Sequence, residues 1–69
     1  MKLSARNQLP GTVEAVAPGA TTAHVTIRLN GGGTVVASIT NEAVAELGLA
    51  PGDSVHAVIK ASDVMVGKD

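Results

Sequence analysis

The sequence of 69 residues contains no cysteine and no phenylalanine, tyrosine or tryptophan. Without cysteine there is neither a disulfide framework nor a thiolate metal site. Without aromatic rings there is no surface on which the bases of a single-stranded nucleic acid could stack. Charge is scarce as well: five Lys and Arg against six Asp and Glu give a net charge of −1. This balance argues against a nucleic-acid partner, because proteins that bind nucleic acids carry a basic surface.

Long apolar runs are also missing. No run approaches the roughly 20 residues that a membrane-spanning helix needs. The N-terminal residues are mainly polar and lack the apolar centre of a signal peptide. We therefore expect a soluble cytoplasmic protein without a membrane partner.

Small aliphatic residues are abundant, and hydrophobic residues make up 45% of the chain. A domain of this size buries only about 60% of the surface that its unfolded chain exposes. Such domains usually rely on a ligand, a metal, disulfides or partner subunits for stability. We expect a homo-oligomer in which part of the apolar surface lies between subunits. A monomeric barrel rich in valine is the alternative.

Glycine and proline divide the chain into short segments that are rich in β-branched residues. The clearest segment runs from Thr22 to Leu29, where apolar residues at odd positions alternate with polar residues at even positions. This period of two predicts a half-buried strand. Similar patterns between the turn residues predict further strands. The five predicted strands cover Thr12 to Val16, Thr22 to Leu29, Thr34 to Thr40, Ser54 to Lys60 and Asp63 to Val66.

The segment from Asn41 to Leu47 is the one helical candidate. Either Thr40 or Asn41 can cap its first turn, and Gly48 is suited to its C-terminal end. The order is therefore three strands, a short helix and two strands, in one domain over residues 1–69. This order predicts an all-β fold, namely a five-stranded OB-like barrel with one short helix between strands three and four.

The residues of an enzyme do not come together in this pattern. Asp63 is distant in sequence from His24 and His56, and no serine lies in a nucleophile elbow. Two histidines are few for a zinc site. The glycines at positions 31–33 join two strands and lack the Lys and Ser/Thr of a phosphate-binding loop. We therefore predict a binding protein that is not an enzyme and has no directly bound metal.

Two short polar segments are candidates for a binding site. Ser4–Gln8 carries a hydroxyl, a guanidinium and two amides, and Lys60–Ser62 carries an ammonium and a hydroxyl at the end of a predicted strand. A tetrahedral oxyanion needs such converging donors and some positive charge. Thr40 adds a hydroxyl beside the start of the helix. The alternative is that Arg6 and Lys60 are ordinary solvated charges.

These segments resemble a known family. The stretches Ser4–Leu9 and Gly11–Val13 strongly resemble the opening of the molbindins, or Mop-like proteins, which contain a TOBE/Mop domain. The stretches Ala37–Thr40, Leu47–Asp53 and Ala57–Val64 match the same family in the same order. The resemblance covers essentially the whole chain, and its first motif is specific.

The resemblance implies an OB-like five-stranded barrel that assembles into a homohexamer, a trimer of dimers. It implies that molybdate, and with it tungstate, is bound at subunit interfaces and needs no further cofactor. It also implies a role in storing the anion and controlling its level in the cytoplasm.

The resemblance further implies a set of ligand residues by matched position. The N-terminal motif supplies side chains and backbone N–H groups. The motif near the C-terminus supplies a cation, a hydroxyl and backbone groups, and a threonine comes from the partner subunit. The residues are Ser4, Ala5, Arg6, Asn7, Lys60, Ala61, Ser62 and, from the partner, Thr40. The family also has a second kind of site near its three-fold axes, for which Thr21, Thr22 and His24 are guesses.

Two other interpretations stay open at the level of sequence. The motif Leu47–Asp53 also resembles the DNA-binding domains of the AbrB type, although five basic residues are few for phosphate neutralisation. A structural or regulatory interaction module without a ligand is the other interpretation.

Overall fold

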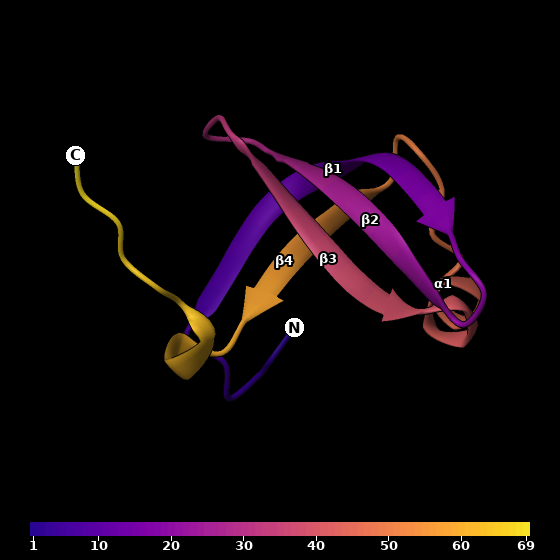
Figure 1. Cartoon of the computed structure of the whole chain (residues 1–69), viewed down its shortest axis with the longest axis horizontal. Helices are drawn as coiled ribbons and strands as arrows, with labels where there is room; N and C mark the ends of the chain where they lie inside the picture. Colours follow the sequence, from indigo (N-terminus) through magenta and orange to yellow (C-terminus); the bar gives the residue numbers. More distant parts are fainter.

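The computed structural model describes all 69 residues and shows one antiparallel sheet of four strands in the order β3-β2-β1-β4. The strands are β1 (Asn7–Pro18), β2 (Thr22–Leu29), β3 (Thr34–Thr40) and β4 (Ser54–Ile59). Helix α1 (Asn41–Leu47) follows β3, and a 3₁₀ turn, η1 (Ala61–Asp63), follows β4. Figure 1 shows that the sheet curls into an open half-barrel, with α1 at one end and η1 at the other.

The longest strand, β1, is the centre of this arrangement because it pairs with both β2 and β4. It begins earlier than the predicted Thr12 to Val16, since Pro10 and Gly11 lie within it. Proline is tolerated there because pairing with β2 starts only at Gly11, so Pro10 has a neighbouring strand on one side alone. A bulge between Val13 and Ala15 then shifts the register against β2 and increases the local twist.

The core lies on the concave side of the sheet. Its buried members are small and aliphatic, as the composition requires: Val13, Ala23, Val25, Ile27 and Ala57. The alternation along β2 is as predicted, because Ala23, Val25 and Ile27 are buried while the polar residues between them are not. Only six of the 69 residues are buried, so a single chain leaves much of its apolar surface in contact with solvent.

Helix α1 spans the predicted residues and has the predicted ends. The Thr40 hydroxyl accepts a hydrogen bond from the backbone N–H of Ala43 at 3.0 Å, so Thr40 is the N-cap. Gly48 ends the helix in the left-handed conformation, with φ at 61°, which glycine adopts without strain.

The structure confirms the predicted all-β fold with one short helix, but the half-barrel has four strands and not the predicted five. The prediction of a fifth strand from Asp63 to Val66 is wrong. Asp63 belongs to η1, and the residues after it pair with no other strand. Val64 has the extended backbone of a strand, with φ at −89° and ψ at 126°. Figure 1 shows the tail leaving the sheet. Residues 64–66 are apolar, which suits a strand, but a strand also needs a neighbouring edge, and the tail has none within its own chain.

Candidate functional site

The two polar segments singled out in the sequence lie together in the structure. They form a shallow pocket of about 470 Å³ whose lining residues are Ser4, Ala5, Arg6, Lys60, Ala61 and Ser62. Five of the six are exposed and Ala5 is half-buried. The pocket is therefore open to solvent on the single chain.

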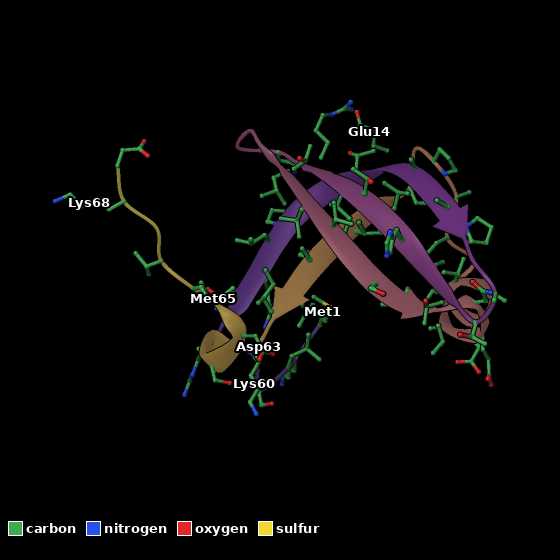
Figure 2. All side chains as sticks on the ribbon, viewed as in Figure 1. Met1, Glu14, Lys60, Asp63, Met65 and Lys68 are labelled. Carbon is green, nitrogen blue, oxygen red and sulfur yellow. The ribbon has the colours of Figure 1, made fainter.

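The pairing of β1 with β4 brings these segments together. Asn7, at the start of β1, lies opposite Ile59, at the end of β4. The residues just before β1 and just after β4 therefore leave the sheet at the same place. Figure 2 shows Lys60 at this corner of the molecule, next to η1.

Asn7 and Gln8 do not line the pocket but hold its walls. The Asn7 side-chain amide donates to the carbonyl of Ile59 at 3.2 Å, which ties the two strand ends to each other. The Gln8 amide donates to the carbonyl of Ala5 at 3.3 Å, which restrains the N-terminal wall. These structural roles were not predicted from the sequence, where the amides counted only as polar groups.

The pocket carries positive charge without a counter-charge. Its lining includes the cations Arg6 and Lys60 and no carboxylate. The ion pair in the structure lies elsewhere, between Arg28 and Glu14 at 4.0 Å. The two free cations can only donate hydrogen bonds, and the two hydroxyls can donate as well as accept. Such a set of groups suits an anion and not a metal cation.

The turn η1 sets the geometry of the second wall. Its hydrogen bonds run from the N–H of Asp63 to the carbonyl of Lys60 at 2.9 Å and from the N–H of Val64 to the carbonyl of Ala61 at 3.2 Å. The N–H groups of Ala61 and Ser62 take no part in these two bonds. The wall therefore offers backbone donors beside the Ser62 hydroxyl.

Thr40 is the one expected ligand that lies in a different region, at the start of α1. It does not line the pocket of its own chain. Its hydroxyl accepts from Ala43, and an accepting hydroxyl still has a proton to donate. Thr40 therefore keeps a proton that it can donate, but it takes no part in the pocket of its own chain.

Other kinds of site are not supported by the structure. No three His, Cys, Asp or Glu side chains gather into a group that could hold a metal ion. The structure also has no helix with the length and apolar character needed to cross a membrane.

Comparison with known proteins identifies the family. Residues 3–66 match the model of the TOBE domain. The chain belongs to the TOBE domain family. It is 44% identical over 66 residues to molybdenum-pterin-binding protein 3 of Clostridium pasteurianum. This alignment covers 96% of this chain and 97% of that protein. It is 45% identical over 67 residues to a probable molybdenum-pterin-binding protein of Haemophilus influenzae, with 97% of both chains covered.

Solved structures of TOBE-domain relatives have the same fold. A molybdate-binding protein from Sporomusa ovata superposes with a TM-score of 0.91 at 41% identity, over 99% of this chain and all of that one. The cytoplasmic molybdate-binding protein ModG, with molybdate bound, gives a TM-score of 0.89 at 55% identity. The match covers 94% of this chain and 46% of the ModG chain.

These relatives confirm the resemblance to the Mop-like proteins that the sequence motifs indicated. The relatives that match over their full length are binding proteins, which confirms that the chain is not an enzyme. The comparisons do not favour the alternative of a DNA-binding regulator of the AbrB type.

Proposed function

We propose that this TOBE domain binds molybdate in the pocket between its N-terminal segment and η1. The observation that carries the proposal is the convergence of Ser4–Arg6 with Lys60–Ser62, from opposite ends of the chain, into one cationic pocket. The molybdate-binding relatives supply the identity of the anion. Arg6 and Lys60 would neutralise the dianion, and the hydroxyls and backbone N–H groups would bind its oxygens.

We further propose that the site is completed by a second copy of the chain. A pocket with five of six lining residues exposed leaves its ligand hydrated, and hydrogen bonds to a charged ligand gain strength when water is excluded. Thr40 of another copy is our candidate for the closing residue. We keep the homohexamer, a trimer of dimers, as the proposed assembly, and Asn7 as a residue that positions the site through Ile59.

The proposed biological role is storage and homeostasis of molybdate in the cytoplasm. Nothing in the donor set distinguishes molybdate from tungstate, because the two anions share charge and shape. Sulfate is smaller, so its oxygens would not reach all the donors of a cavity sized for molybdate, and it would bind more weakly. We therefore expect tungstate to compete with molybdate and sulfate to compete poorly.

Isothermal titration of the purified chain with molybdate tests this proposal, with sulfate as the control anion. Replacing Lys60 by methionine keeps most of the length of the side chain and removes its charge. This variant should weaken molybdate binding by about tenfold or more, because charge-assisted hydrogen bonds are the strong ones. Lys68→Met removes an equivalent charge from the tail, which Figure 2 shows far from Lys60, and should leave the affinity unchanged.

The outcomes separate clearly. Saturable heat with molybdate that is lost in Lys60→Met and kept in Lys68→Met supports the pocket. Equal affinities in all three proteins would mean that molybdate binds elsewhere. No saturable heat with the unmodified chain would refute molybdate binding itself.

A further inference from the structure

The two walls of the anion pocket are held in place unequally. The wall that contains Lys60–Ser62 directly follows β4 and is fixed by the two backbone hydrogen bonds of η1. The wall that contains Ser4–Arg6 belongs to no helix or strand, because β1 begins at Asn7. Figure 1 shows this N-terminal segment leaving the start of β1 next to η1. The N-terminal wall therefore depends on contacts outside regular secondary structure.

One hydrogen bond ties the N-terminal wall to the sheet. The side-chain amide of Gln8 donates to the carbonyl oxygen of Ala5 at 3.3 Å. No other hydrogen bond of the structure involves residues 1–6, whether through backbone or through side chains. The ion pair between Arg28 and Glu14 lies elsewhere. Three of the six residues that line the pocket thus depend on the Gln8 amide for hydrogen bonding to the rest of the chain.

Gln8 can restrain a neighbouring segment because its own position is fixed. It lies in β1 opposite Val58 of β4, and the next residue, Leu9, packs against the hydrophobic core. Gln8 and Ala5 are both half-buried, so the hydrogen bond between them is partly protected from competing water. A side chain on a fixed strand therefore holds a segment that lies outside the sheet.

The same hydrogen bond orients a backbone donor. The carbonyl of Ala5 and the N–H of Arg6 belong to one planar trans peptide unit, in which the two groups point in opposite directions. The carbonyl is turned toward Gln8, which does not line the pocket, so the N–H of Arg6 points away from Gln8. This N–H has no hydrogen-bond partner within the chain, and it is therefore free to donate to an anion.

We infer that Gln8 is a positioning residue of the anion pocket. Its amide holds the carbonyl of Ala5 so that the N–H of Arg6 faces the anion before the anion binds. The inference rests on the proposed function and extends it to a residue that does not touch the ligand. Without this hydrogen bond the N-terminal wall would adopt the binding arrangement for only part of the time. The apparent affinity would then fall in proportion to that fraction.

Backbone nitrogen relaxation, measured by NMR, tests the tether without any anion. Gln8→Met keeps a flexible side chain of similar size and removes the hydrogen-bond donor. In the unmodified chain the N–H groups of residues 4–6 should have order parameters near about 0.85, as in rigid backbone. In Gln8→Met they should fall below about 0.6, as in flexible segments. Equal order parameters in the two proteins would overturn the inference.

Isothermal titration with molybdate measures the consequence for binding. A hydrogen bond between neutral groups is of modest net strength, so Gln8→Met should weaken molybdate binding by about threefold to tenfold. Gln8→Asn keeps the amide but shortens its reach by one methylene, and it should weaken binding to a similar extent. Circular dichroism verifies that both variants fold. Full affinity in either folded variant would overturn the inference, because the reach of the amide to Ala5 would then not matter.

Asp53→Ala is the matched control for a general loss of stability. It also removes one hydrogen bond between a side chain and the backbone, which the N–H of Ala50 donates at 2.9 Å. Asp53 precedes β4, whereas the anion pocket lies beyond the other end of that strand. This variant should unfold at a lower temperature and keep its affinity for molybdate. An equal loss of affinity in Asp53→Ala and Gln8→Met would assign the effect of Gln8 to stability alone and overturn the inference.

Failure of the inference and failure of the proposed function give different results. No saturable heat from the unmodified chain would refute molybdate binding, and with it the role of Gln8 in binding. Saturable heat with equal affinities in the unmodified chain and Gln8→Met would leave the proposed function standing and refute the role of Gln8 alone.

Discussion

Gly11 is the position at which the smallest change should disturb the structure most. It is buried in β1, opposite Leu29 of β2 and Val55 of β4. A Cβ atom built there would lie 2.5 Å from the carbonyl oxygen of Arg28 and 2.8 Å from the Cγ2 atom of Ile27. The first of these atoms is backbone and the second belongs to a buried core side chain. Neither can move away without shifting β2.

The substitution Gly11→Ala should therefore destabilise the protein by about 2 kcal/mol, within the range observed for overpacked cores. For a domain of this size this corresponds to a fall of about 8–16 °C in the midpoint of thermal unfolding. Scanning calorimetry measures the shift. The chain concentration has to be held constant, since assembly makes the midpoint depend on concentration.

Gly31→Ala is the matched control, because a Cβ atom there meets nothing within 4 Å and the backbone is not left-handed. Replacing such a glycine reduces the entropy of the unfolded chain and should be neutral or stabilising by less than about 1 kcal/mol. If both alanine variants unfold within about 2 °C of the unmodified chain, the close approach of β1 to β2 is not the constraint described here.

Three further predictions concern the core, the helix cap and the ligand. Val25→Ala removes two methyl groups from a side chain that is 2% exposed. It should lower the free energy of unfolding in urea by about 2 kcal/mol, with an unchanged m-value. A loss below about 0.5 kcal/mol would contradict the assignment of Val25 to the core. Thr40→Ala removes the cap of α1 and should cost about 1 kcal/mol. Thr40→Ser should restore both stability and the affinity for molybdate, whereas an alanine variant with full affinity would exclude Thr40 as a ligand. Tungstate should displace molybdate in competition titrations at similar concentrations, and a preference of more than about 100-fold, or about 2.7 kcal/mol, would show that the site reads more than charge and shape.

The elements that could be predicted were those whose signals are local. The alternation along β2 fixes which face is buried, and Thr40 and Gly48 fix the ends of α1, because each acts on backbone groups within a few residues. The bounds of β1 were less accurate, since Pro10 and Gly11 are usual at turns. Within this sheet, Pro10 lies where only β4 is beside it, and Gly11 lies where β2 comes too close for a side chain.

The residues of the pocket could be predicted from the sequence, but their arrangement in space could not. Ser4–Arg6 and Lys60–Ser62 were identified from donor chemistry and from a family motif, and the register of β1 against β4 brings them together. That register depends on pairing between distant segments, which a single sequence does not specify. The same limit explains Asn7, for which the sequence suggested only a backbone N–H donor and whose side-chain amide bonds the carbonyl of Ile59.

The prediction of the fifth strand failed because a strand needs a neighbouring strand as well as a suitable sequence. The apolar run of residues 64–66 is compatible with a strand, but it does not say which sheet provides the neighbouring strand. In a chain with six buried residues, the exposed apolar residues 64–66 are unfavourable in isolation. Residues 64–66 directly follow η1, which carries Ala61 and Ser62 of the anion pocket. Under the proposed function an anion in this pocket contacts two subunits, so its affinity should rise with chain concentration in dilute solution. A titration at several chain concentrations measures this dependence, and an affinity that stays constant across the dissociation range of the oligomer would uncouple the pocket from the assembly.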